Sequence, residues 1–423
     1  MNKIAGVQTP LLALALLNGV TFGVVITILA PYMYESGFTG TEFGLLTSVA
    51  TVSSLALTIA SGPLSDMLGA RKVVAAAYAL KFIAFTLFTI PDTLFLAIAF
   101  LLHGMSLGVS WSAGTALVAR SSRDEQLHRQ FTYFMASNMV GGAVGSLAGV
   151  LPPLLSSILT TDLLTAYRIT IAIMAPLSLV QSVIALVIRE DFGSSRIHAS
   201  PRELATGFRE ALSDRRFKLL IAFNLVIGLG ASMSIHNIGY YFAAKYGVTS
   251  AEIGVVNAVE QVAMAMTAVT ASRLSERAGS ILKVYVMLTS MSVPLLIAMT
   301  IVDSYALAAA IYVVRTVLMN AANPLLGALA FRYVPRRRRG AASSLFSLSF
   351  SMPATAGRAL GGALLDVDLE LPLRLTAVIY AIALAYVYSK KGELEPPGEI
   401  IVKRREGGAQ LAKAPQQLQA SKP

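Results

Sequence analysis

The chain has 423 residues, of which 55% are hydrophobic and only 13% are charged, and its mean hydropathy is +0.66. A soluble domain carries about 25% charged residues, so this composition excludes a globular protein with a water-facing surface. Cysteine is absent, which excludes disulfides, thiolate metal sites and a cysteine nucleophile, and the net charge is +11.

The apolar residues form long blocks, each near the ~20 residues that a helix needs to cross a bilayer. Backbone groups find no water in lipid, so we expect every block to be helical. The predicted membrane helices are twelve, at residues 10–34, 42–62, 73–90, 94–118, 131–152, 164–188, 217–244, 250–272, 283–302, 305–332, 341–364 and 373–389. The first is too long for a signal-peptide core. The predicted fold is therefore an all-α multi-pass membrane protein.

The turn after the first helix reads GFTGTEFG at residues 37–44, and the pattern returns as GVTSAEIG at residues 247–254. The offset of 210 residues is about half of the chain. Thr39 and Glu42 have the spacing of a helix capping box, and so do their counterparts in the second copy. We expect both copies to be tight turns that begin the second and the eighth helix.

The same offset relates residues 62–72 to residues 272–282, between the second and third helices of each half. Six helices separate the copies, so both copies lie on one side of the membrane and the repeat is parallel. Two six-helix bundles follow from this arrangement. The predicted regions are an N-terminal bundle at 1–188, a linker at 189–216, a C-terminal bundle at 217–389 and a disordered tail at 390–423.

The linker carries the sequence SPRELATGFREAL, with Ser200 as the expected N-cap, Pro201 at the first helical position and Glu203 at the third. Apolar residues then recur at four-residue spacing. We predict a short amphipathic helix that lies on the inner face of the membrane.

Topology follows from the basic residues, which gather in cytoplasmic loops of membrane proteins. If both termini are cytoplasmic, the inner loops and tails hold 28 of the 34 Lys and Arg residues, so we expect that orientation. The positive charge then fits contact with anionic lipid headgroups better than binding to nucleic acid.

The loop after the second helix resembles the signature of the major facilitator superfamily, Gly-x-x-x-Asp-Arg/Lys-x-Gly-Arg-Arg. Gly62, Asp66, Gly69 and Arg71 match this pattern, and Lys72 supplies a second basic residue, although two other basic positions differ. The resemblance extends over the membrane part, because helix number, linker and repeat agree with it. It implies a secondary transporter of two six-helix bundles and does not identify a substrate.

In that family the acid of the signature contacts the start of the eleventh helix, across the two halves, and closes the inner face. A helix N-terminus attracts a carboxylate, so we expect this role for Asp66. The repeat assigns the corresponding role to Glu276 and its neighbour Arg277, opposite the fifth helix. A solvated charged loop is the alternative.

Ionisable groups inside membrane segments are costly and indicate function. Glu260 is the acid near the centre of a helix, Asn257 and Gln261 share its side, and Arg315 lies mid-way along the tenth helix. Glu260 and Arg315 can form a proton- or substrate-linked pair, a fixed structural pair, or no pair. In the first case, protonation of Glu260 frees Arg315 to bind an anion.

Further candidates for a central cavity are His103 on the fourth helix, and His236, Asn237 and Tyr240 on the seventh. The alternative is that such polar and small residues only allow close helix packing. We expect no metal site, because neither histidine has a second ligand at suitable spacing.

Two intramembrane cations have no clear role in the sequence. Lys81 has no acid in the membrane part of its half, and Arg358 has Asp366 and Glu370 as nearby candidates for an ion pair.

The expected function is secondary active transport of a small solute across the plasma membrane, by alternating access and coupled to protons. The excess of interior cations favours an anionic solute. We expect a monomer without cofactors. A drug or metabolite efflux carrier and a transport-inactive sensor are the alternatives. The sequence has no Gly-rich phosphate-binding loop, which argues against an ATP-driven pump. It also has no cluster of catalytic residues, which argues against an enzyme.

Overall fold

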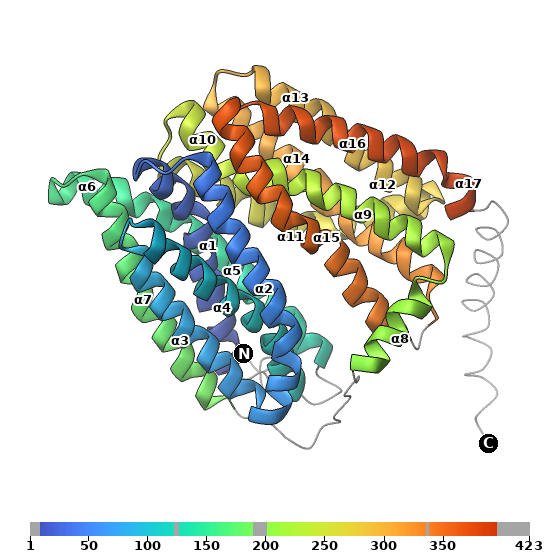
Figure 1. The fold of residues 1–423 in the computed structure, drawn as a ribbon, viewed down its shortest axis with the longest axis horizontal. Helices are drawn as coiled ribbons and strands as arrows, with labels where there is room; N and C mark the ends of the chain where they lie inside the picture. Colours follow the sequence, from blue (N-terminus) through green and yellow to red (C-terminus); the bar gives the residue numbers. More distant parts are fainter. Residues whose placement is uncertain (1–8, 122–126, 189–200, 336–337, 396–423) are drawn as a thin grey trace, which may run out of the picture.

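The computed structural model describes residues 9–121, 127–188, 201–335 and 338–395; within them, the side chains of 128, 201–205, 265–274 and 276–278 are outside the description. Every regular element in these ranges is a helix. Two groups of helices form a V, closest together near α1 and α10 (Figure 1). This arrangement confirms the predicted all-α fold.

The first half contains six helical segments, and the fifth of them is interrupted. They are α1 (Thr9–Glu35), α2 (Gly40–Leu68), α3 (Ala70–Phe88), α4 (Thr93–Arg120), α5 (Leu127–Leu147) with η2 (Ala148–Val150) and α6 (Leu151–Leu159), and α7 (Leu163–Val187).

The linker and the second half follow with the same number of segments, of which the first and third are interrupted. The linker helix is α8 (Pro201–Ala211). The half then comprises α9 (Arg215–Ser234) with η3 (Ile235–Asn237) and α10 (Ile238–Tyr246), α11 (Ser250–Ala278), α12 (Ile281–Ser290) with α13 (Ser292–Ile301), α14 (Tyr305–Ala330) with η4 (Phe331–Tyr333), α15 (Arg339–Val367) and α16 (Leu371–Ser389); α17 (Lys391–Leu394) ends the described chain.

The interruptions have local causes. Proline has no N–H to donate to a helical hydrogen bond. Pro152 and Pro153 lie in the first turn of α6, and Pro294 lies in the first turn of α13, so they directly follow the two breaks. At η3 the cause is a side chain, because the Asn237 amide donates to the carbonyl of Met233 at 3.3 Å. The sequence-based boundaries missed these breaks.

The two repeated turns have the predicted geometry. Thr39 and Thr249 each complete a capping box with the glutamate three residues later. Gly37 and Gly247 have φ values of +81° and +64°, which favour glycine. We call the end of the molecule that carries these turns the turn end, and the opposite end, which carries α8, the linker end.

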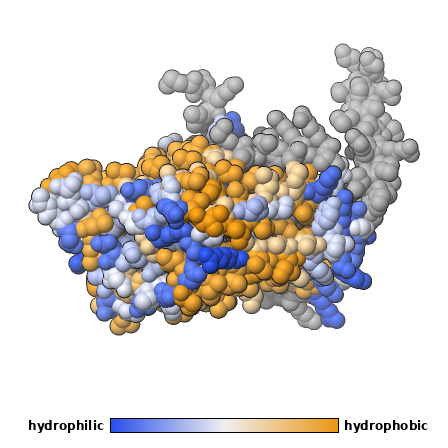
Figure 2. Space-filling model, turned by 90° about the horizontal axis from the view of Figure 1, so that it is seen from above, coloured by the Kyte–Doolittle hydropathy of each residue, from blue (hydrophilic) through white to orange (hydrophobic). Residues whose placement is uncertain are grey.

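Nine helices of the described chain, interrupted ones included, are long and apolar enough to span a membrane. Large apolar side chains on their outer faces are exposed, for example Val183 at 61% and Ile382 at 66%. Figure 2 shows large apolar areas on one face of the molecule, with hydrophilic residues between and beside them. That α3, α11 and α15 also cross, making twelve, and that both termini are cytoplasmic, stay predictions.

The linker helix packs on the second half. Arg338 donates two hydrogen bonds to the Glu210 carboxylate, at 2.6 and 2.8 Å, and thereby joins α8 to the start of α15. Gly207 of α8 approaches Ala341 closely. The amphipathic helix is therefore present, whereas its expected cap, Ser200, and the rest of residues 189–200 lie outside the described residues.

The predicted disordered tail begins later than residue 390. α17 continues the chain beyond α16, and Glu395 is only 4% exposed. Its carboxylate accepts a hydrogen bond from the Ile281 N–H at 2.9 Å and so caps α12. The expectation of disorder was wrong for residues 390–395, because this cap fixes them; residues 396–423 lie outside the described part.

Candidate transport site and closed turn end

An acid of one half caps a helix of the other at the turn end. The Asp366 carboxylate, at the end of α15, accepts hydrogen bonds from the Gly40 N–H at 2.7 Å and the Thr41 N–H at 2.8 Å. The Thr41 hydroxyl donates a third at 2.5 Å. The start of α2 has unpaired N–H groups and a partial positive charge, so a carboxylate is a favourable partner. Asp366 therefore joins the two halves.

The second repeated turn makes a different contact. The Ser250 hydroxyl, at the start of α11, donates to the carbonyl of Gly149 at 2.7 Å. In a regular helix that carbonyl would accept from residue 153, but Pro153 has no N–H to donate. The break in the fifth segment thus leaves the Gly149 carbonyl free to accept from the other half. The Ser250 N–H makes a second contact, donating to the Tyr167 hydroxyl at 3.1 Å.

Close approach of the halves at this end depends on small residues. A Cβ added to Gly362 of α15 would lie 2.1 Å from the carbonyl oxygen of Gly40 and 2.8 Å from the Cα of Gly44. At the linker end, a Cβ added to Gly62 or Gly340 would meet nothing within 4 Å. Among the described residues, the close backbone approaches between the halves therefore lie toward the turn end.

Three predicted site residues belong to this closed end. The Tyr240 hydroxyl donates to the carbonyl of Phe38 at 2.8 Å, and its ring stacks on Phe43 of the other half, with 5.5 Å between centroids. Asn257 donates to Thr27 at 3.0 Å, and Gln261 donates to Ser146 at 3.2 Å. Their polar groups join α11 and α10 to the first half.

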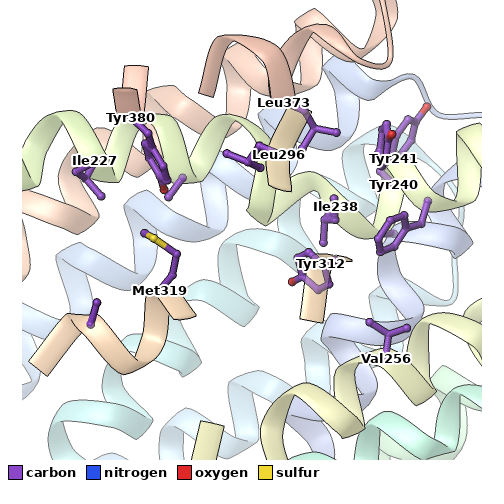
Figure 3. Close-up of a cluster of buried hydrophobic side chains, with 14 of the residues drawn as sticks. Ile227, Ile238, Tyr240, Tyr241, Val256, Leu296, Tyr312, Met319, Leu373 and Tyr380 are labelled. Atoms are coloured by element: carbon purple, nitrogen blue, oxygen red, sulfur yellow. The ribbon is translucent and has the colours of Figure 1, made fainter. Parts of the chain in front are cut away.

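Glu260 lies between these last two contacts on α11 and is partly exposed. Its side chain interacts with the Tyr312 hydroxyl of α14, and Arg315 acts on its charge from farther away. Within the described chain, no ion pair joins Glu260 to Arg315, which is the third of the alternatives left open by the sequence. Figure 3 shows Tyr312 beside Ile238 in the core of the second half.

Arg315 faces away from the other half. Its Nε donates to Ser292 at 2.9 Å, and its Nη2 donates to the Tyr380 hydroxyl at 3.2 Å. Only 3% of its surface is exposed. Neutral oxygens of α13 and α16 therefore hold this cation inside the second bundle, which explains why it does not reach Glu260.

Lys81 has the same kind of environment in the first half. Its ammonium donates to Asn18 at 3.1 Å and Thr21 at 2.9 Å, and it lies 5.1 Å from the centre of the Tyr78 ring. His103 is buried beside it, stacked on Phe85 with 6.1 Å between centroids. The expected position of His103 on a central cavity is not observed, because the ring packs against α3.

The helix break at η3 places His236 and Asn237 against α15. The Asn237 amide donates to the backbone carbonyl of Arg358 at 3.2 Å and is itself 1% exposed, so it has a packing role. The His236 imidazole is exposed, and the charge of Arg358 acts on it. The expectation that Arg358 pairs with Asp366 or Glu370 is wrong. Asp366 caps α2, and Glu370 pairs with Lys245 at 2.5 Å.

The signature loop makes one described ion pair, and it lies within the first half. Asp66 pairs with Arg120 at the end of α4, where the expected contact was the start of α15. Gly69 has a φ of +88° and turns the chain into α3. Arg71 and Lys72 are in the first turn of α3, and the side chains of Glu276 and Arg277 lie outside the described residues.

Sequence reasoning missed that Asp366 and Ser250 join the two halves. A signal existed for each: an acid at the end of the eleventh segment, and a Pro-Pro pair that leaves a carbonyl free on the fifth.

Comparison with known proteins gives a weak sequence relative and several solved transporters of similar fold. Quinolone resistance protein NorA of Staphylococcus aureus is 28% identical over 122 residues, so the match spans 27% of this chain and 30% of that relative's length. The solved nucleoside transporter NupG superimposes with a TM-score of 0.74 at 14% identity, over 90% of this chain and 98% of that one. A bacterial homologue of the human lysosomal transporter Spinster, inward-facing and unoccupied, gives 0.71 at 16% identity, over 89% and 94%.

A bacterial homologue of the iron transporter ferroportin, in an inward-facing state, also gives a TM-score of 0.71 at 16% identity, over 89% of this chain and 96% of that one. At such identities the likeness establishes the fold alone. The family model described as Major Facilitator Superfamily matches twice, at residues 11–236 and 220–421. The chain therefore belongs to the major facilitator superfamily.

Proposed function

We propose that this multi-pass membrane protein is a secondary active transporter of the plasma membrane, which moves a small solute by alternating access. The carrying observation is the unequal contact between the halves, with hydrogen bonds at the turn end and open space around Gly62 and Gly340 at the linker end. With the turn end outside, as the basic residues predict, this is an inward-open state. Breaking the turn-end contacts while the linker end closes completes the cycle.

Proton coupling is assigned to Glu260. A carboxylate inside a membrane segment is costly, so its charge depends on its surroundings. Asn257 and Gln261, on the same stretch of α11, hold the other half through Thr27 and Ser146. Opening the turn end removes these contacts and changes the environment of Glu260. Its partners are the Tyr312 hydroxyl and the charge of Arg315, and proton uptake would weaken the attraction to that cation.

The test is solute uptake into proteoliposomes with and without an imposed pH gradient, comparing the native chain with Glu260→Gln. The variant keeps the shape and removes the proton site, so we expect uptake to continue down a solute gradient and to lose its response to pH. Glu393→Gln, at an acid that pairs with the exposed Arg215, is the matched control and should keep the pH response. An unchanged pH response in Glu260→Gln would contradict the coupling role.

Drug efflux is the second candidate, because the sequence match to the quinolone resistance protein favours it. Vesicles loaded with a quinolone and energised by a pH gradient distinguish the two solute classes. Loss of quinolone in a Glu260-dependent manner would support efflux. No transport of any tested solute in either assay would favour a sensor on the same fold and would contradict the proposed function.

A further inference from the structure

We propose that Arg358 and His236 bind the anionic group of the transported solute, a carboxylate or a phosphate. The inference rests on the proposed function, since it places the solute between the two halves. It assigns a binding role to Arg358, whose Nε has no hydrogen-bond partner in the described chain, and to the neighbouring His236.

Arg358 is an unpaired cation. Within the described part of the chain, its Nε is buried without a hydrogen-bond partner, and no acidic side chain acts on its charge. Its own backbone is fixed, because its carbonyl accepts from Asn237 and lies against Gly44 of α2. The backbone of Arg358 is therefore held where both halves meet, and its Nε finds no acceptor among the residues described. Buried donors without partners are rare in proteins, so a ligand is the natural acceptor.

The other intramembrane cations do not share this property. Lys81 has two neutral acceptors, Asn18 and Thr21, and Arg315 has two, Ser292 and Tyr380. Both are also almost completely buried. The fold thus satisfies two cations internally and leaves a third, partly exposed, without an acceptor among the residues described.

His236 lies beside Arg358; one side of its ring is hydrogen-bonded to the backbone of Ala231, which leaves the other ring nitrogen for the ligand. η3 turns its imidazole to an exposed position, and the charges acting on it come from Arg358 and Arg315. No acidic side chain among the residues described acts on its charge. The positive potential of this corner repels cations and selects anions.

The ligand class follows from guanidinium geometry. The edge formed by Nε and one Nη donates two parallel hydrogen bonds, which match two oxygens of a carboxylate or phosphate. A neutral amide or an ammonium offers no such pair of acceptors. Loss of this pair weakens binding by roughly tenfold to a hundredfold.

The experiment is thermal unfolding of the full-length purified chain in detergent, titrated with benzoate, citrate and inorganic phosphate. Benzamide and benzylammonium match benzoate in size and carry no negative charge. A bound anion stabilises the folded state by mass action, so the Tm rises with concentration and saturates. We expect this response for at least one anion and for neither control compound. Phosphate and the two carboxylates separate the two anionic groups.

Arg358→Gln is expected to abolish the saturable rise, and His236→Gln to weaken it. Arg358→Lys keeps the charge, loses the paired donors and binds with intermediate affinity. Without ligand, Arg358→Gln should unfold at or above the native Tm, since it removes an unpaired cation. Arg374→Gln, at an exposed arginine paired with Asp368, is the matched control and keeps the full response.

A native chain that none of the three anions stabilises would overturn the inference, as would an anion response retained in both Arg358→Gln and Arg358→Lys. A destabilised ligand-free Arg358→Gln chain would also contradict it, because the guanidinium would then have a structural role. Transport of neutral or cationic solutes without an anion response refutes this inference alone. Anion binding without any transport refutes the proposed function alone.

Discussion

Replacing Asp366 by Asn should open the turn end. The Asp366 carboxylate belongs to the second half, and it accepts three hydrogen bonds from Gly40 and Thr41 at the start of α2, in the first half. Asparagine has nearly the same shape, but it lacks the charge and has one oxygen instead of two. The substitution therefore weakens the cap without creating a cavity or a clash.

The size of the effect can be worked from these contacts. A carboxylate at an exposed helix N-terminus contributes about 0.3–1 kcal/mol, and a hydrogen bond to a charged group contributes more than a neutral one. Asp366 is exposed, which keeps the total near about 1 kcal/mol. Such a change multiplies the ratio of open to closed molecules about fivefold.

Cysteine labelling measures this ratio, because the chain contains no cysteine of its own. Ala30 of α1 is 6% exposed and faces Gly239 of the other half, so a cysteine there is protected while the turn end is closed. The rate of labelling by a membrane-impermeant maleimide is then proportional to the open population. Asp366→Asn should raise that rate about fivefold.

The control is Asp368→Asn, two residues away. Asp368 pairs with the exposed Arg374 at 3.2 Å, in the same half. It should leave the labelling of the cysteine at position 30 unchanged. Equal rates in native and Asp366→Asn chains would refute the reasoning, and so would an equal increase in Asp368→Asn.

Two further substitutions test packing and the buried cations. Gly362→Ala should also raise the labelling rate, because the added Cβ collides with the carbonyl of Gly40. Gly62→Ala should leave the labelling rate unchanged, because nothing lies near its added Cβ. It should raise the free energy of unfolding by up to about 1 kcal/mol, since alanine favours a helix more than glycine does. Asn18→Ala should lower the unfolding free energy by about 1–3 kcal/mol, since the Lys81 ammonium loses an acceptor, and in a Lys81→Met background it should cost less. A double-mutant cycle without coupling would contradict the second expectation.

The fold was readable from the sequence because lipid leaves few alternatives. Long apolar blocks must become helices, and the repeated capping boxes at Thr39 and Thr249 lie where the spacing placed them. The breaks were harder to read, since η3 depends on one amide that competes for a backbone carbonyl.

The site was less predictable, because polarity does not reveal direction. His103 and Glu260 look alike as intramembrane polar residues, yet one packs against a phenylalanine inside its bundle and the other faces a tyrosine beside the inter-half contacts. Arg315 seemed a partner for Glu260, but Ser292 and Tyr380 hold it elsewhere. Which neighbours satisfy a buried group depends on helix rotation, and a single sequence does not record that rotation.

The central claim is that the two ends of the molecule open in turn, and two distances on the same pair of helices test it. Spin labels at Leu45 of α2 and Leu360 of α15 report the turn end, and labels at Met67 and Ser344 report the linker end; all four positions are exposed. With Asp366→Asn, we predict a longer Leu45–Leu360 distance and a shorter Met67–Ser344 distance in the same population. Lengthening at both ends, or at the turn end alone, would contradict alternating access.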